Sequence, residues 1–120
     1  MAYSISVKRV YEAPLPSDGC RILVDRLWPR GLSSDYAVID EWMKEIAPSH
    51  ELRRWFAHDP TKWDSFQKMY RAELDTDQCA ALINTILERA KTRDVTLLFA
   101  AKNEAQNNAV VLKQVIETTR

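Results

Sequence analysis

Two short apolar runs limit the fold more than any other feature of this sequence. Residues 95–101 read Val-Thr-Leu-Leu-Phe-Ala-Ala, and residues 22–24 read Ile-Leu-Val. Runs of this length that lack polar alternation are typical of strands buried on both faces, and such strands occur mainly in parallel sheets covered by other layers. Residues 4–11 alternate with a period of two and predict a further strand. We therefore expect strands over 4–11, 21–27 and 95–101, and the pattern leaves the direction of the first strand open.

Helical periodicity and caps predict about five helices between and after these strands. The first follows Ser33, Ser34 and Asp35, contains residues 39–46 and ends before Pro48. A short helix follows Ser49, and a third begins at Pro60 and stops near residue 75. A fourth follows residues 75–77, and the last runs from 104 to about 117 with Asn103 as its cap. The predicted fold is a small α/β sandwich, three-layer-like, with a short, mainly parallel sheet.

Length and charge limit the class of protein. The chain has 120 residues, 17 basic and 17 acidic side chains and a net charge of zero. We expect one α/β domain over 1–120, and the absence of a positive field argues against a dedicated nucleic-acid binder. No basic segment followed by an apolar one opens the chain, and no apolar run is long enough to span a membrane. A cytoplasmic protein fits best, and the oligomeric state stays open.

The carboxyl ends of the predicted strands carry polar residues, and ligands of open α/β sheets bind at such ends. Asp25 and Arg26 follow one strand, and Lys102 and Asn103 follow another. If these strands are parallel, their ends share one edge, where arginines can hold an anion while an indole stacks on a planar group. The candidate ligand-binding residues are Arg26, Trp28, Arg30, Lys44, Arg53, Lys102, Asn103 and Asn107.

Proton transfer has one local candidate, the pair His58 and Asp59, in which an imidazole adjoins a carboxylate. The structural alternative is that Asp59 caps the third helix while His58 fills a gap. Cys20 and Cys79 lack a neighbouring base, and the two histidines do not cluster with other metal ligands. The sequence therefore predicts no metal site, indicates no cofactor, and leaves open whether the protein is an enzyme.

Several motifs together resemble the YeaO-like family, a small bacterial branch of a larger domain family of unknown function. They are KRVY at 8–11, LVDRLWPRG at 23–31, EWMKEIAPS at 41–49, LRRWFAHDP at 52–60 and TLLFAAK at 96–102. The resemblance implies a compact cytoplasmic α/β domain and implies no activity. The larger family places a Cys-His-Arg cluster where this chain has residues 106–108, and the closer pattern has an aspartate where this chain has Asn103.

Three functional interpretations follow. The first is a protein that binds a small anionic or phosphorylated molecule in a pocket at the strand ends and acts on it if His58 and Asp59 cooperate. The second is a non-catalytic module that binds a protein, or less readily nucleic acid, through its arginine and tryptophan side chains. The third is that these residues serve the fold alone. A cleft lined by Trp28 and Trp55 favours the first interpretation, and a flat exposed face favours the second.

Overall fold

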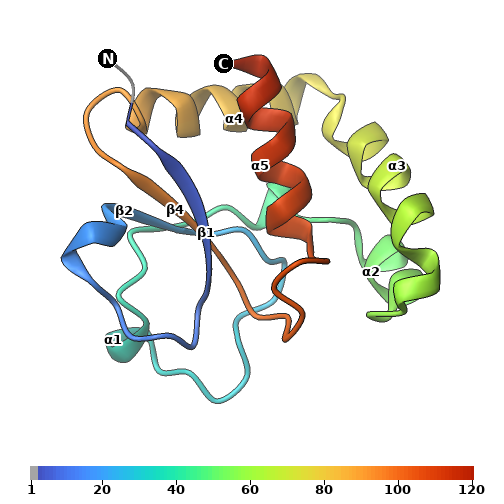
Figure 1. The fold of residues 1–120 in the computed structure, drawn as a ribbon, viewed down its shortest axis with the longest axis horizontal. Helices are drawn as coiled ribbons and strands as arrows, with labels where there is room; N and C mark the ends of the chain where they lie inside the picture. Colours follow the sequence, from blue (N-terminus) through green and yellow to red (C-terminus); the bar gives the residue numbers. More distant parts are fainter. Residues whose placement is uncertain (1–2) are drawn as a thin grey trace.

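The computed structural model describes residues 3–120, and its centre is a four-stranded parallel sheet. The spatial order is β1-β4-β2-β3 (Figure 1), with β1 at Ile5–Arg9, β2 at Cys20–Leu23, β3 at Glu41–Trp42 and β4 at Val95–Phe99. The predicted α/β class is confirmed, and the first strand is parallel to the others.

The last strand of the chain, β4, lies between the first two. Val95 is paired with Ile5 of β1 on one side and with Cys20 of β2 on the other. All five residues of β4 are buried, as its nearly uniform apolar sequence predicts. Because the three strands run in the same direction, the chain leaves β2 and β4 at the same edge of the sheet.

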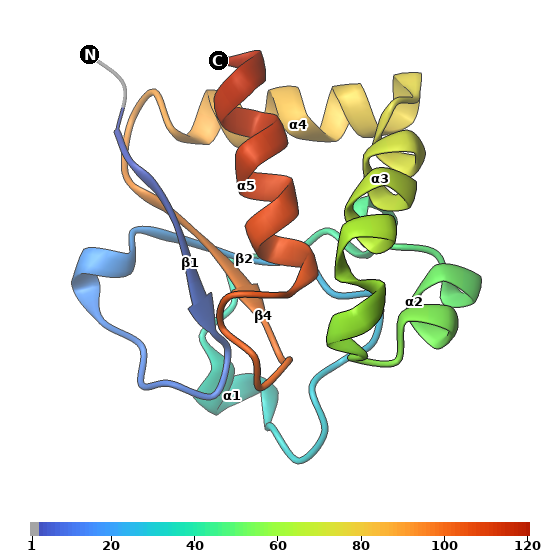
Figure 2. The same cartoon turned by 45° about the vertical axis from the view of Figure 1, so that its right-hand side comes forward.

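Five α-helices and three short 3-10 helices accompany the sheet (Figures 1 and 2). The α-helices are α1 at Ser34–Ala37, α2 at His50–Phe56, α3 at Trp63–Leu74, α4 at Asp77–Arg89 and α5 at Asn108–Thr119. The 3-10 helices span Pro16–Asp18, Lys44–Ile46 and Pro60–Lys62. The helices α2, α3 and α4 form close to where their caps and periodicity predict them.

The two faces of the sheet are covered differently. Val95, Leu97 and Phe99 of β4 point into the main core, which also contains buried side chains from α2, α3, α4 and α5. Leu98 points to the opposite face, where it forms a smaller cluster with Leu23 and half-buried side chains of the neighbouring loops. Helices therefore cover one face, while loops and the single turn of α1 cover the other.

The helix expected over residues 39–46 is wrong. Val38 adopts a left-handed conformation with φ of 48° and ends α1, and the chain then runs along the free edge of β2 as β3. There the amides of Asp40 and Met43 donate hydrogen bonds to the carbonyls of Arg21 and Leu23. The apolar spacing fits a helix, but backbone groups at the sheet edge bind this segment as a strand.

Two element boundaries also differ from the prediction. The last helix begins at Asn108, not at 104, and its cap is Asn107, whose side chain accepts a hydrogen bond from the amide of Val110. Asn103 caps a tight turn instead, accepting from the amides of Ala105 and Gln106. The strand expected over 21–27 ends at Leu23, so Asp25 and the residues after it belong to the loop above the sheet.

None of the described helices combines the length and the apolar composition needed to cross a membrane.

Candidate functional site

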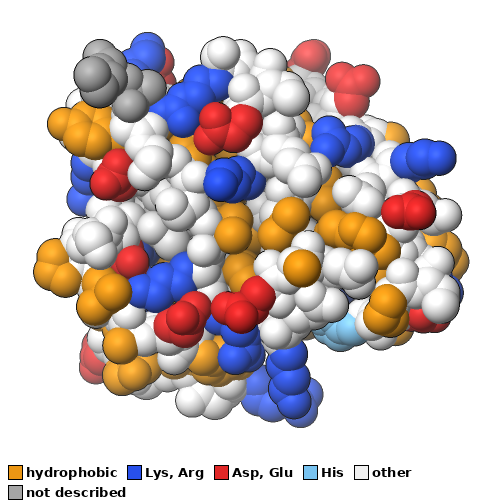
Figure 3. Space-filling model, viewed as in Figure 1, with side chains coloured by type: hydrophobic (Ala, Val, Ile, Leu, Met, Phe, Trp, Pro, Cys, Tyr) orange, Lys and Arg blue, Asp and Glu red, His pale blue; other side chains and the backbone are white. Residues whose placement is uncertain are grey.

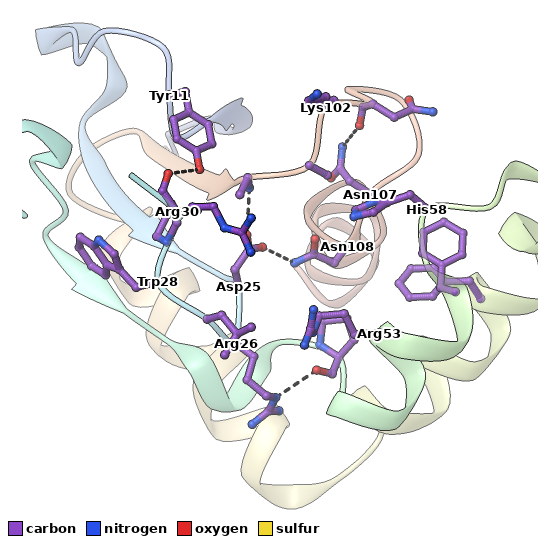
Figure 4. Close-up of a pocket in the computed structure, with 18 residues that line it drawn as sticks. Tyr11, Asp25, Arg26, Trp28, Arg30, Arg53, His58, Lys102, Asn107 and Asn108 are labelled. Carbon is purple, nitrogen blue, oxygen red and sulfur yellow. Dashed lines mark hydrogen bonds between the residues drawn. The ribbon is translucent and has the colours of Figure 1, made fainter. Parts of the chain in front are cut away.

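A cavity of about 840 Å³ lies at the carboxyl ends of β2 and β4. Most of its lining comes from four parts of the chain: the loop 25–30 after β2, residues 100–103 after β4, α2 with the turn that follows it, and the start of α5. Tyr11, Pro48 and Phe66 complete the lining. Figure 4 shows side chains from these parts directed toward one another. The parallel arrangement of β2 and β4 therefore brings together two polar segments that are about 75 residues apart in the sequence.

Three basic side chains, Arg30, Arg53 and Lys102, line the cavity and are exposed to solvent. We call these three residues the basic rim. None of their charged groups forms a hydrogen bond or an ion pair with the part of the chain that the structure describes. Lys and Arg side chains are visible at the lower edge of the molecule in Figure 3. The charged groups of the rim are thus free to bind an anion.

Asp25 and Asn108 lie deeper in the cavity and are half-buried. One carboxylate oxygen of Asp25 accepts from the amide of Ala100 at 2.9 Å, and the other accepts from Nδ2 of Asn108 at 3.1 Å (Figure 4). Burial raises the pKa of Asp25 above its usual range. The two hydrogen bonds and the positive charge of Arg53 oppose that shift without cancelling it.

Arg26 also lines the cavity, but most of its guanidinium group has a structural role. Nε donates to the carbonyl of Pro48 at 3.1 Å, and one terminal nitrogen donates to the carbonyl of Ala47 at 3.0 Å. The side chain thereby ties the loop after β2 to the segment that leads into α2. Arg26 contributes positive charge to the cavity but less hydrogen-bonding capacity than the basic rim.

Hydrogen bonds position the loop 28–31 above the sheet. Nε1 of Trp28 donates to the carbonyl of Leu32 at 2.6 Å, and the indole packs edge-on against Trp42. The hydroxyl of Tyr11 donates to the carbonyl of Arg30 at 2.8 Å. Trp28 lines the cavity, whereas Trp55 does not: its side chain is 38% exposed, with the ammonium of Lys62 over its ring. Trp28 thus lies in the cleft, whereas Trp55 lies on the open surface.

His58 and Asp59 do not act on the cavity as a pair. His58 lines it, in a turn where His58 and Ala57 both have positive φ, an unusual conformation for residues other than glycine. Asp59 is outside the lining, and its side chain accepts from the hydroxyl and the amide of Thr61, which lowers its pKa. Asp59 therefore caps the 3-10 helix Pro60–Lys62, as the structural alternative predicts.

The structure brings most of the candidate residues to one cavity. Those that line it are Arg26, Trp28, Arg30, Arg53, His58, Lys102, Asn103 and Asn107. Lys44 does not line the cavity. Its segment forms the 3-10 helix Lys44–Ile46 after β3 in place of the expected α-helix, and its ammonium lies 4.8 Å from the centre of the Trp42 ring. Asn107 is almost fully buried and is occupied with capping α5.

Sequence reasoning missed Asn108 and Tyr11 and left Asp25 out of the binding residues. The sequence signals for Asp25 and Asn108 are weak, since a carboxylate after a strand and two asparagines before a helix are ordinary features. Cys20 and Cys79 are both buried, and neither lines the cavity. No group of three or more His, Cys, Asp and Glu side chains that could hold a metal ion occurs within residues 3–120.

Comparison with known proteins identifies the family. A family model described as "Inactive DUF488-N3 subclade" matches residues 4–120. The chain belongs to this family. It is 45% identical over 109 residues to the uncharacterized protein YeaO of Escherichia coli, covering 91% of this chain and 93% of that protein. The resemblance to YeaO-like proteins is thereby confirmed.

Two mycobacterial proteins are also similar over nearly the whole chain. The uncharacterized protein Rv3073c of Mycobacterium tuberculosis is 38% identical over 112 residues, which are 93% of this chain and 92% of that protein. The uncharacterized protein Mb3100c of Mycobacterium bovis matches to the same extent. No solved structure matches the chain.

Proposed function

We propose that this protein binds a small anionic molecule, bearing a phosphate or carboxylate group, in the cavity at the carboxyl ends of β2 and β4, and that it does so without turnover. One observation carries the proposal. The three cations of the basic rim, whose charged groups have no partner among residues 3–120, converge on one cavity in a chain whose net charge is zero.

The charge balance of the cavity supports an anion as the ligand. Its lining contains four side chains that are positive at neutral pH, Arg26 and the three of the basic rim, against the single carboxylate of Asp25. Charges of one sign gathered in a concave site raise the local concentration of oppositely charged ligands. Guanidinium groups suit phosphate and carboxylate because they present paired donors to paired oxygens.

Binding without turnover fits the rest of the site. His58 has no carboxylate partner from its own loop, because Asp59 is engaged in capping. The cavity also lacks a cysteine nucleophile among its lining residues. The description of the family as an inactive subclade agrees with a role in binding.

Titration with inorganic phosphate tests the proposal. We expect measurable binding by calorimetry at low ionic strength and weaker binding as chloride is added, because exposed charges are screened. Arg53→Gln and Lys102→Gln should each weaken phosphate binding about tenfold, since a charge-assisted hydrogen bond contributes roughly 1.5 kcal/mol. Both side chains are exposed, so neither change should impair folding.

Two substitutions serve as matched controls. Arg54→Gln removes the same charge from the neighbouring position of α2, and Lys68→Gln removes one from α3, both on exposed side chains that do not line the cavity. Phosphate affinity should change less than twofold in either control. The proposal fails if the wild-type protein does not bind phosphate, or if Arg54→Gln weakens binding as much as Arg53→Gln.

A further inference from the structure

The deep part of the cavity offers hydrogen-bond acceptors, in contrast to the donors of the basic rim. Each carboxylate oxygen of Asp25 accepts one hydrogen bond from the protein, from the amide of Ala100 or from Nδ2 of Asn108. A carboxylate accommodates about four hydrogen bonds in total. Asp25 therefore has acceptor capacity left for a ligand.

The orientation of the Asn108 amide adds a second acceptor. Its Nδ2 donates to the carbonyl of Val24 at 3.0 Å and to Asp25 at 3.1 Å. Both partners only accept, so they require the nitrogen of the amide on their side and direct Oδ1 away from them. Oδ1 forms no hydrogen bond with the described residues. Every buried side-chain nitrogen or oxygen among those residues does have a hydrogen-bond partner, so Oδ1 is not buried. Oδ1 is therefore accessible, on a residue that lines the cavity.

These two acceptors restrict what can occupy the deep part of the cavity. A phosphate or carboxylate placed there is repelled by Asp25 and gains no hydrogen bond from Oδ1 of Asn108. A ligand ammonium group is opposed by the positive charges of Arg26 and Arg53, which line the same cavity as Asp25. Neutral hydroxyl groups can donate one hydrogen bond to each acceptor, and they carry no charge for Asp25 or the cations to repel.

We infer that the ligand is a polyhydroxylated anion of the sugar-phosphate type, with its phosphate on the basic rim and two hydroxyl groups, one donating to Asp25 and the other to Oδ1 of Asn108. This inference rests on the proposed anion site and makes Asp25 a residue that determines specificity. A volume of about 840 Å³ is within the usual range of small-molecule sites and accommodates a ligand of this size.

The test compares two phosphates with the same number of carbons, D-ribose 5-phosphate and n-pentyl phosphate, with inorganic phosphate as the reference. We expect ribose 5-phosphate to bind wild-type protein at least about tenfold more tightly than pentyl phosphate. The pentyl chain leaves the acceptors of Asp25 and Asn108 desolvated and unpaired, and sites built to bond a hydroxyl reject analogues that lack it.

Asp25→Asn gives the matching change on the protein. It should reduce the preference for ribose 5-phosphate to less than threefold and strengthen binding of inorganic phosphate, because a negative charge leaves the cavity. The new amide has to direct its nitrogen toward the donor of Ala100 or of Asn108, so this variant can lose stability. The comparison of the two organic phosphates on wild-type protein tests the preference for hydroxyl groups even if the Asp25→Asn variant does not fold.

The possible results separate the two proposals. If inorganic phosphate binds and pentyl phosphate binds as tightly as ribose 5-phosphate, the inference about hydroxyl groups is overturned and the anion site stands. A folded Asp25→Asn variant that keeps the tenfold preference overturns it as well. If none of the three phosphates binds wild-type protein, both the anion site and the inference fall.

Discussion

Arg26 illustrates, at the scale of a residue, how a side chain typical of anion sites serves the fold. Its guanidinium donates to the carbonyls of Ala47 and Pro48, two residues that are buried. Arg30 lies only four positions further on and points an unpaired side chain into solvent at the cavity. The same residue type therefore has two different roles within one loop, and the difference comes from which carbonyl groups lie within reach.

Replacing each arginine by methionine should separate these roles. We expect Arg26→Met to lower the free energy of unfolding by about 2 kcal/mol, because two buried carbonyls lose charge-assisted hydrogen bonds. Arg30→Met should change it by less than about 0.5 kcal/mol. Urea denaturation of the two variants measures the difference, and equal losses would contradict the structural role of Arg26.

At the scale of elements, the start of α5 decides the shape of the cavity. The segment 100–107 leaves β4, turns around Asn103 and enters the helix at Asn107, which places Lys102 and Asn108 on the same cavity. The sequence offers Asn103 and Asn107 as caps at a spacing of one helical turn, and either choice fits the pattern of apolar residues. Burial of Asn107, together with its hydrogen bond to the carbonyl of Asn103, favours the later start.

The two asparagines therefore predict different costs of substitution. Asn107→Ala should lower the free energy of unfolding by about 1–2 kcal/mol through the loss of the helix cap. Asn103→Ala should cost less than about 0.5 kcal/mol, since water can satisfy the amides of an exposed turn. Thermal unfolding followed by circular dichroism compares the two variants. A larger loss of stability in Asn103→Ala than in Asn107→Ala would contradict the assignment of Asn107 as the cap of α5.

At the scale of the whole molecule, the strand order requires a tight connection between β1 and β2. Residues 10–19 cross from one side of β4 to the other with only a short 3-10 helix, although such parallel connections usually contain a longer helix. The connection ends at Gly19, with φ of 66°, against the turn between α4 and β4. The amide of Cys20 then donates to the carbonyl of Asp94 at 2.8 Å.

Gly19 should consequently tolerate no side chain. A Cβ atom there would lie 2.0 Å from the carbonyl oxygen of Asp94, so we expect Gly19→Ala to destabilise the protein by about 3 kcal/mol or more. Gly31 also has a positive φ, 75°, but a Cβ meets nothing within 4 Å. Gly31→Ala should cost only about 1 kcal/mol of conformational strain. Equilibrium denaturation of both variants provides the comparison, and similar losses would argue against close packing at Gly19.

The local sequence pattern was sufficient to predict the structure of those segments that can fold in only one way. The nearly uniform apolar run at 95–101 predicts a strand buried on both faces, and Ser49, Asp59 and Thr76 cap helices with their own side chains. Parallel strands then determine that the segments after β2 and β4 meet at one edge, which is why Arg30 and Lys102 were predictable as neighbours. These features depend on contacts within a few residues or on the direction of strands.

Tertiary structure decided the features that depend on a distant partner. Residues 39–46 have helical spacing, yet the free edge of β2 binds residues 41 and 42 as a strand, and Lys44 lies outside the site. Asp25 becomes the deep acceptor of the cavity because Ala100 and Asn108, some 75 and 83 positions away, donate to it. The sequence alone thus determines the three longer strands of the sheet and the charges that follow two of them. Only packing decides which polar groups are left unpaired, because a hydrogen bond is formed by whichever partner the fold brings within reach.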